Sequence, residues 1–412
     1  NGVSLLAIVL SIDYMRSSGG KPTYFALFLL MLAGMNGVVL SHDLFNLYVF
    51  MEVAACRSYA LVAFGLKHDE LEAAYKYLVL AAGASMIILL GIALVYARTG
   101  SLDMREVSAA LALSPYRQGR TTLFVIMLFI AAFGLTMAMV PFHAWLPDAH
   151  PSAPAPISAM LSGVLIKASG VYALVRLLYN VFGIQDLPRI GDTLLGMGIL
   201  TLVVGGLLAL VQTDYKRLLA YSSIGQVGYM LLGFGLGTPL GFIAGLYHLL
   251  NHATFKSLLF LVSGSVQHRT GTRDLNRMGG LAKRMPVTAL TSVFGSLAIS
   301  GVPPFNGFFS KLLLVVALLS VGQQTHEARY YWYAVIAVVF SLVTLAYMLK
   351  TQRKAFFGEL KSEWARTRES RPAMLVPLVV LALLTLTLGV SYPWLNQVLL
   401  GPAAAVLTTT LK

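Results

Sequence analysis

Long apolar stretches, separated by short polar connections, recur along almost the whole chain. About 20 apolar residues in a helix are enough to cross the roughly 30 Å hydrocarbon core of a membrane. Each such stretch therefore predicts a membrane-spanning α-helix. The eleven complete candidates are 24–41, 44–66, 73–98, 121–140, 157–179, 196–212, 218–236, 240–263, 288–316, 331–349 and 375–398. A further stretch, 3–15, is too short to cross alone and indicates the end of a helix whose start is missing.

The composition agrees with this pattern. Hydrophobic residues make up 57% of the 412 residues and charged residues only 11%, whereas a soluble domain has about 25% charged residues. No long polar segment divides the chain. We therefore predict one transmembrane domain over residues 1–412, with an all-α polytopic fold from which N-terminal helices are missing.

The formal net charge of +13 raises the question of a nucleic-acid partner, and the distribution of the basic residues argues against one. When the spans cross a membrane in turn, one side receives eighteen basic residues and the other receives seven. The first side holds Arg16, Lys21, Lys67, Lys76, Lys216, Arg217, Arg269, Arg273, Arg277, Lys283, Arg284, Lys350, Arg353, Lys354, Lys361, Arg366, Arg368 and Arg371. The second side holds Arg98, Arg105, Arg117, Arg120, Arg189, Arg329 and Lys412. Because cytoplasmic loops carry an excess of Lys and Arg, we predict that the first side is cytoplasmic.

The sequence contains no recognisable cofactor or metal site. Its single cysteine, Cys56, can neither close an internal disulfide nor hold an iron–sulfur cluster alone. Without strands there is no Gly-rich nucleotide loop of the strand-to-helix kind. We expect no cofactor and no catalytic residues in this chain, so any redox chemistry would belong to a partner.

Proline and glycine interrupt two of the predicted spans. One break centres on Val140-Pro141-Phe142 and the other on Val302-Pro303-Pro304-Phe305, about 160 residues later. Breaks at membrane depth occur where a cavity or another helix satisfies the freed backbone groups, and corresponding breaks in two halves are typical of inverted-repeat transporters. Ordinary proline kinks are the alternative. The polar segment 141–156 suits a turn at the membrane interface, with Trp145 as its anchor.

A stripe of ionisable residues lies inside the apolar segment 246–262. His248, His252 and Lys256 are spaced at i, i+4 and i+8 and therefore share one helix face. Ionisable side chains at membrane depth cost roughly 2.5–3.5 kcal/mol each and usually line ion or proton pathways. The stripe predicts a proton wire, while a polar face that packs against a neighbouring helix is the alternative.

Further charged residues occur in other spans. Glu52, Lys167 and Lys311 each lie within a predicted apolar helix. Histidine can connect such groups because its unperturbed pKa is close to neutral. A glutamate, three lysines and two histidines spread over four spans favour an ion pathway. Fixed ion pairs that hold the helices together remain the structural alternative.

The motifs resemble the antiporter-like subunits of the respiratory complex I superfamily, which includes Mrp sodium/proton antiporters and energy-converting membrane-bound hydrogenases. The residues that carry this resemblance are Asp43-Leu-Phe-Asn-Leu-Tyr-Val-Phe-Met-Glu52, Ser58-Tyr-Ala-Leu-Val-Ala-Phe64, Val140-Pro-Phe-His-Ala-Trp-Leu-Pro-Asp-Ala-His150, Asp214-Tyr-Lys-Arg-Leu-Leu-Ala-Tyr-Ser-Ser223, the His248/His252/Lys256 stripe and Gly301-Val-Pro-Pro-Phe-Asn-Gly-Phe-Phe-Ser-Lys311. Lys311 at the end of the second break, and the segment from Arg329 onward, are most similar to the Mrp D-type subunit.

The resemblance implies two inverted five-helix repeats with broken helices, here 24–179 and 196–349, followed by a C-terminal helix at 375–398. It also implies two half-channels that are joined by a horizontal polar axis. By position, Glu52 is the family's helix glutamate, Lys167 the central lysine, and Lys311 the terminal lysine near the exit. His248, His252 and Lys256 form the connecting row.

The function implied is that of an H⁺- or Na⁺-translocating subunit of a redox-driven pump, such as an NADH:quinone oxidoreductase or an energy-converting hydrogenase. The alternative is a subunit of a Mrp-type Na⁺/H⁺ antiporter without a redox partner. The implied partners are other membrane subunits, a peripheral redox module and the lipid bilayer, in a prokaryotic-type inner (plasma) membrane.

Two residues depart from the family pattern. Thr136 stands where the family usually has a lysine, and Arg57 stands where it normally has a small residue. Arginine stays protonated, so we expect Arg57 to stabilise Glu52 as a carboxylate, directly or through water. The first half-channel would then be a modified one, although five residues correspond to about 140° around a helix, which makes direct pairing difficult.

Overall fold

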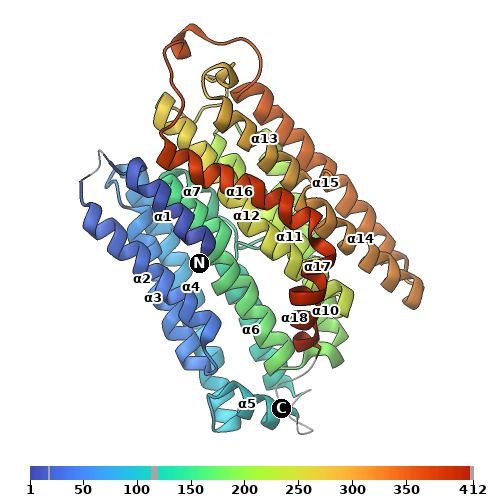
Figure 1. Cartoon of the computed structure of the whole chain (residues 1–412). Helices are drawn as coiled ribbons and strands as arrows, with labels where there is room; N and C mark the ends of the chain where they lie inside the picture. The colour runs from blue at the N-terminus through green and yellow to red at the C-terminus, as the bar shows by residue number, and fades with distance from the viewer. Residues whose placement is uncertain (17–18, 113–118, 409–412) are drawn as a thin grey trace.

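The computed structural model describes residues 1–16, 19–112 and 119–408, and these residues form a bundle of helices with isolated bridges but no β-strand (Figure 1). A helix satisfies its backbone hydrogen bonds internally, which is why apolar sequences cross lipid in this form. Of the basic residues used to predict the topology, Arg117 and Lys412 lie outside the described residues.

The first half begins with α1 (Gly2–Tyr14), α2 (Lys21–Leu40), α3 (Leu44–Val62), α4 (His68–Thr99) and the short α5 (Met104–Ala112). It continues with α6 (Arg120–Thr136), α7 (Leu146–Ser152) and α8 (Ala155–Met160). α8 runs on through η1 (Leu161–Tyr172), α9 (Ala173–Arg176) and η2 (Leu177–Val181). These four segments form the continuous Ala155–Val181 helix, which contains π-helical turns.

The second half contains α10 (Pro188–Val211), α11 (Tyr215–Gly235), α12 (Pro239–Thr270), α13 (Pro286–Ser300), α14 (Asn306–Thr325) and α15 (Ala328–Ala355). The chain ends in α16 (Pro372–Val390), α17 (Tyr392–Leu395), η6 (Asn396–Leu400) and α18 (Gly401–Leu407). Short 3-10 turns form η3 (Ile184–Asp186), η4 (Leu281–Lys283) and η5 (Ser362–Trp364).

Two predicted spans differ from the helices found. The interrupted span 288–316 is divided into α13 and α14, because prolines at 303 and 304 lack backbone donors and Gly301 has a φ of 78°. α14 then extends to Thr325. The predicted C-terminal helix 375–398 ends at Val390, and Pro393 lies in the first turn of the next helix, α17.

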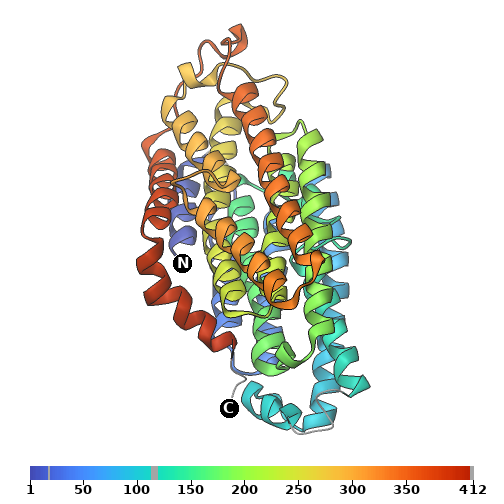
Figure 2. The same cartoon turned by 90° about the vertical axis from the view of Figure 1, so that its right-hand side faces the viewer.

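Seven helices among the described residues are long and apolar enough to cross a membrane: α2, α4, the Ala155–Val181 helix, α10, α14, α15 and α16. The shorter apolar helices are α1, α6 and α13. α3, α11 and α12 carry more polar residues. α12 runs through the middle of the bundle and contacts α11, α13, α14, α16 and the Ala155–Val181 helix (Figures 1 and 2). Its polar side chains are therefore surrounded by protein rather than by lipid.

Two turns at opposite ends of the bundle have the same structure. After α4 the chain reads Thr99-Gly-Ser-Leu-Asp103, and after α12 it reads Thr270-Gly-Thr-Arg-Asp274. The glycines have φ angles of 70° and 69°. The first turn accepts a backbone hydrogen bond from the start of α3 (Leu44 to Leu102, 2.9 Å), and the second accepts one from the start of α11 (Tyr215 to Arg273, 3.0 Å). α5 follows the first turn at the lower end of Figure 1, whereas α13 starts after the second turn near the upper end.

Candidate ion-translocation site

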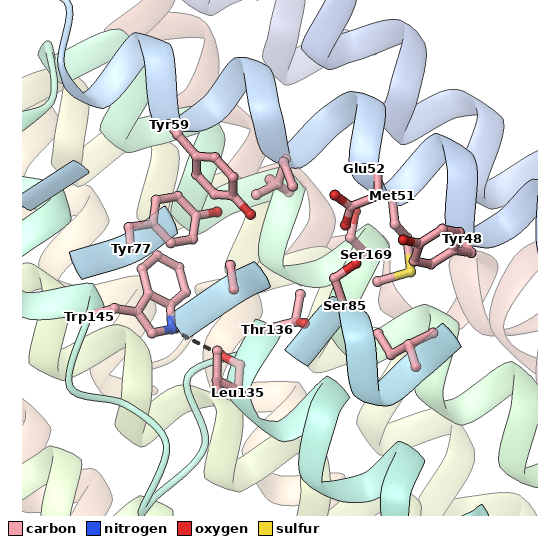
Figure 3. Close-up of a pocket in the computed structure, with 14 residues that line it drawn as sticks. Tyr48, Met51, Glu52, Tyr59, Tyr77, Ser85, Leu135, Thr136, Trp145 and Ser169 are labelled. Carbon is pink, nitrogen blue, oxygen red and sulfur yellow. Dashed lines mark hydrogen bonds between the residues drawn. The ribbon is translucent and has the colours of Figure 1, made fainter. Parts of the chain in front are cut away.

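Glu52 borders a small internal cavity in the first half of the chain. The cavity lies between α3, α4, α6 and the Ala155–Val181 helix, and Ser85, Thr136 and Ser169 also line it (Figure 3). About 30 Å³ is open to the centres of water-sized spheres. Since one water needs about 10–15 Å³ of such space, the cavity has room for a small water cluster beside the half-buried Glu52.

Neither unusual residue of this half contacts Glu52 as a charge partner. The Thr136 hydroxyl donates a hydrogen bond to the carbonyl oxygen of Ala132 in its own helix (3.1 Å). Among the described residues, no ion pair within 4.0 Å joins Glu52 to Arg57. The expectation of a direct contact is therefore wrong, for the angular reason given above, and a contact through water stays a prediction.

Trp145 is not an interfacial anchor, which corrects the expectation from sequence. Its side chain is 1% exposed and stacks on Tyr77, with 4.1 Å between the ring centroids and 5° between the planes. Its Nε1 donates to the carbonyl oxygen of Leu135 (2.9 Å). The turn after α6 folds back against α4, so the tryptophan closes one side of the Glu52 cavity (Figure 3).

A group of buried nitrogens lies between the two halves. Lys167 is 2% exposed, and its Nζ has no hydrogen-bond partner among the described residues. The same holds for both ring nitrogens of His150 and of His252, which are fully buried. Lys167, Lys256 and His150 are near enough to His252 to interact with it electrostatically. The structure therefore brings together residues that are about 100 positions apart in the sequence.

Lys256 is held by the neighbouring helix α11. Its Nζ donates to the carbonyl oxygen of Leu219 (2.8 Å) and to the hydroxyl of Ser222. The side chain is fully buried. Ser223, one residue further on, shares a hydrogen bond with Ser162 of the Ala155–Val181 helix (2.8 Å). These hydroxyls place polar groups on both sides of the interface between α11 and the Ala155–Val181 helix.

His248 connects three helices. Its Nδ1 is 3.0 Å from the Ser310 hydroxyl on α14, and its Nε2 is 3.1 Å from Oε1 of Gln226 on α11. If Nε2 carries the proton and donates to Gln226, Nδ1 accepts from Ser310 when that hydroxyl turns to it from the carbonyl oxygen of Gly307 (3.2 Å). His248 can thus connect α11 and α14 through hydrogen bonds at its two ring nitrogens.

Lys311 ends the row next to the break between α13 and α14. Its Nζ donates to the carbonyl oxygen of Ile299 (2.8 Å) and to the Ser341 hydroxyl on α15 (3.1 Å). The ring of Tyr229 lies 4.7 Å from the same nitrogen. The last carbonyls of a helix have no partner within the helix and carry partial negative charge. The break in the chain therefore supplies the acceptor that holds the Lys311 ammonium.

The sequence interpretation missed three members of this row. His150 was expected at the interface, yet it packs on the ring of Phe260 (4.6 Å) inside the bundle. Gln226 and Ser310 carried only a weak signal, because neutral polar residues are common in helices; their place inside apolar spans is the clue that was available.

The described residues of the row do not gather enough potential ligands around one point to bind a metal ion. Within the described ranges, no cluster of three or more His, Cys, Asp or Glu residues could hold a metal. Among the described residues the only buried carboxylate is Asp13, and it pairs with Arg371 (3.0 Å). The row consists of lysines, histidines and neutral polar side chains, and Glu52 borders the cavity of the first half.

Comparison with known proteins places the chain in a family. The sequence model described as NADH:quinone oxidoreductase/Mrp antiporter, TM, matches residues 41–344. The chain belongs to this family. As a family member it is similar to the NADH-quinone oxidoreductase subunit N of Desulforudis audaxviator, with 36% identity over 402 residues that cover 93% of this chain and 78% of that protein.

Other relatives belong to antiporters. The D-type subunit of the Na(+)/H(+) antiporter of Alkalihalophilus pseudofirmus is 33% identical over 409 residues, which cover 99% of this chain and 81% of that protein. Among solved structures, a chain of the Mrp complex from Dietzia sp. superposes with a TM-score of 0.87 at 29% identity and covers 98% of this chain and 81% of that one. The predicted resemblance is thus confirmed: this family member is a polytopic membrane protein, and its relatives include subunits of prokaryotic multi-subunit complexes.

Proposed function

We propose that the chain is an ion-translocating membrane subunit of a complex I-related, redox-driven pump. The observation that carries this proposal is the buried row from Lys167 through His150, His252, Lys256 and His248 to Lys311. Three of its side chains, Lys167, His150 and His252, have nitrogens without a protein partner among the described residues. Fixed ion pairs would not leave such groups unpaired at membrane depth, whereas a proton pathway requires groups that can gain and lose a hydrogen bond.

The chemistry of the row supports protons over sodium as the ion. A sodium ion needs several oxygen ligands, and it is repelled by ammonium groups. The row offers three lysines and three histidines but no carboxylate, and Glu52 borders the cavity of the first half. Protons can travel along such groups because each side chain can carry the charge itself. H⁺ is therefore the ion in this proposal.

The three lysines of the row have different parts in this mechanism. Lys256 and Lys311 donate to carbonyl oxygens, which accept but never donate, so these positions stabilise the ammonium form. Lys167 lacks such an acceptor among the described residues. A proton on Lys167 is therefore not tied to one fixed acceptor, and it can move on when the neighbouring charges change. Glu52 and the water-sized cavity would load the row from the first half.

We infer that the fold consists of two inverted five-helix repeats, with α2 to the Ala155–Val181 helix as the first and α10 to α15 as the second. The matched turns support this inference. The bridges Asp43–Asp103 and Asp214–Asp274 are 171 positions apart. α4 and α12 each have 32 residues, and Asp43 and Asp214 each accept a hydrogen bond from the backbone of the third residue after them. An odd number of crossings between the two turns places them at opposite ends of the bundle.

The proposed orientation puts the upper end of Figure 1 in the cytoplasm, because the loops there include 269–284 and 350–371, which are rich in Lys and Arg. The proposed partners are other membrane subunits and a peripheral redox module. A subunit of a Mrp-type Na⁺/H⁺ antiporter is the second candidate, supported by the antiporter relative from Alkalihalophilus pseudofirmus and by the Mrp complex structure.

Proton movement by the intact complex in sealed vesicles tests the proposal. We expect the vesicle lumen to acidify when the electron donor and acceptor of the complex are supplied. Acidification driven only by an imposed Na⁺ gradient would instead establish the antiporter. A complex that moves no protons under either condition would contradict both functions.

A matched pair of variants connects that activity to the row. Lys167→Met should allow assembly, since it keeps the length of a side chain without fixed partners among the described residues, and it should stop proton movement. Lys283→Met is the control, because Lys283 is exposed at the upper end and far from the row. Equal proton movement by these two variants would exclude a proton path through Lys167.

A further inference from the structure

An apolar groove runs between α13 and α15 on the outside of the bundle. Val293 and Leu297 on α13 and Leu345 and Leu349 on α15 line it, and it encloses about 400 Å³. Leu349 is 52% exposed, so the groove opens outward. The one amide in its wall, Gln352, already donates to Ser292 and Ser296 (2.7 Å each). The groove therefore offers an apolar surface at membrane depth.

A basic hollow of about 450 Å³ adjoins the upper end of this groove. Lys350, Arg353 and Lys354 line it together with one acidic residue, Glu359. Lys350 donates to the carbonyl oxygen of Leu210 (2.7 Å), and Lys354 donates to Asn276. Among the described residues, no hydrogen bond or ion pair occupies the guanidinium of Arg353, which is exposed. The hollow keeps a net positive charge and a free bidentate donor.

The two cavities share a boundary. Arg353 and Phe357 line both the apolar groove and the basic hollow. From Leu345 to Arg353 the helix rises roughly 12 Å, at 1.5 Å per residue. The guanidinium of Arg353 thus lies at the upper end of the apolar groove. The two helices that form the groove, α13 and α15, lie side by side there (Figures 1 and 2).

We propose that this composite cavity binds an anionic phospholipid, with an acyl chain in the groove between α13 and α15 and the phosphate on Arg353. Basic pockets between membrane helices at the cytoplasmic side suit anionic lipid head groups, and a guanidinium fork matches two phosphate oxygens. An apolar helix of a partner subunit would fill the groove but would leave Arg353 without a counter-charge. The free charge directly above the groove is what selects a lipid.

The position of the site connects it to the polar row. α13 supplies Ile299 and α15 supplies Ser341, and these two residues hold Lys311. A lipid between the same two helices sets how closely they approach each other. It would therefore act on the geometry around Lys311 without touching it.

Photocrosslinking in the assembled complex tests the site. The complex is reconstituted into phosphatidylcholine vesicles that contain a trace of phosphatidylglycerol or phosphatidylcholine with a photoreactive acyl chain. Peptides that contain 293–297 and 345–352 are then analysed by mass spectrometry. We expect the phosphatidylglycerol probe to label them well above the phosphatidylcholine probe. Equal labelling by both probes would show ordinary contact with bulk lipid and would overturn the proposal.

Matched variants separate the head-group contact from the groove. Arg353→Gln should lower labelling by phosphatidylglycerol roughly fivefold, the factor expected for one basic residue near an anionic lipid. Arg284→Gln, an exposed arginine at the same end outside both cavities, should not. Leu349→Trp should block the groove, whereas Leu383→Trp on α16, where the leucine is also 52% exposed, should not. Equal effects within either pair would contradict the assignment.

A competition experiment distinguishes binding of a lipid from binding of free phosphate. Excess inorganic phosphate should leave the labelling unchanged, because the acyl chain contributes to binding by the lipid alone. Loss of the label in inorganic phosphate would mean that the hollow binds the free anion, and this result would also overturn the lipid site.

Discussion

The α3/α4 pair and the α11/α12 pair share a backbone plan but carry different polar groups. At positions 171 apart, Glu52 on α3 corresponds to Ser223 on α11, and Ser85 on α4 corresponds to Lys256 on α12. The first pair thus carries an acid on its first helix, the second pair carries a lysine on its second helix, and a serine stands at each matched position. Glu52 is half-buried beside a cavity that can hold water, whereas Lys256 is fully buried and donates two hydrogen bonds.

This difference indicates that the two helix pairs share one backbone arrangement but have different parts in proton transfer. The matched turns keep the two pairs in the same register. The residue type at each corresponding position then decides whether the pair has an acid beside a cavity or a buried lysine with hydrogen-bond acceptors. The first pair suits exchange of protons with water. The second holds a buried lysine by hydrogen bonds to the neighbouring helix.

Removing a lysine of the second half should have the largest effect among the changes that compare the two helix pairs. We expect Lys256→Ala and Lys311→Ala each to lower proton pumping roughly tenfold or more, since about 1.4 kcal/mol in the barrier of a proton transfer already gives a factor of ten. Assembly should persist, because most of the surrounding side chains are apolar. Vesicle acidification and native gel electrophoresis measure these two properties. Normal pumping by assembled variants would favour structural ion pairs.

The proposed inversion of the two turns can be tested by chemical labelling. Arg105 and Asn276 are 171 positions apart and both are exposed. After Cys56 is replaced by alanine, a membrane-impermeant thiol reagent added outside intact cells should label Arg105→Cys and spare Asn276→Cys. The reverse pattern would invert the topology, and labelling of both would contradict opposite ends.

The modified first half-channel should tolerate a return to the family pattern. We expect Thr136→Lys combined with Arg57→Ser to keep pumping intact or raise it up to roughly twofold, because the lysine would supply a titratable group beside the Glu52 cavity. Initial rates of vesicle acidification measure the effect. If the double variant does not pump while Arg57→Ser alone pumps normally, Arg57 does not compensate for the missing lysine at position 136. Arg57 would then be assigned to contacts with a partner subunit.

The smallest expected effect concerns the matched turns. Gly100→Ala and Gly271→Ala should each destabilise the protein by about 1–2 kcal/mol, because alanine is strained at positive φ. A Cβ would meet no atom within 4 Å at either position, so the cost should be conformational and similar for both. Thermal unfolding of the purified complex compares them. Clearly unequal shifts of the unfolding temperature would show that the two turns do not contribute equally to stability.

The helical class, the stripe on one face of α12 and the interruption of the helices near prolines 303 and 304 were predictable because they depend on local properties. An apolar run must satisfy its own backbone in lipid, a spacing of four residues stays on one helix face, and a proline interrupts hydrogen bonding wherever it occurs. The family itself was also recognisable from motifs such as that from Val140 to His150.

Which side chains contact one another between helices could be decided only by the tertiary structure. The sequence offered no reason why Trp145 should stack on Tyr77, why His150 should lie inside the bundle, or why Gln226 and Ser310 should bracket His248. It placed Arg57 near Glu52 along the chain, yet no ion pair joins them. Periodicity specifies which face of a helix is polar, but which residue meets that face depends on how distant helices pack, and many sequences are compatible with each packing.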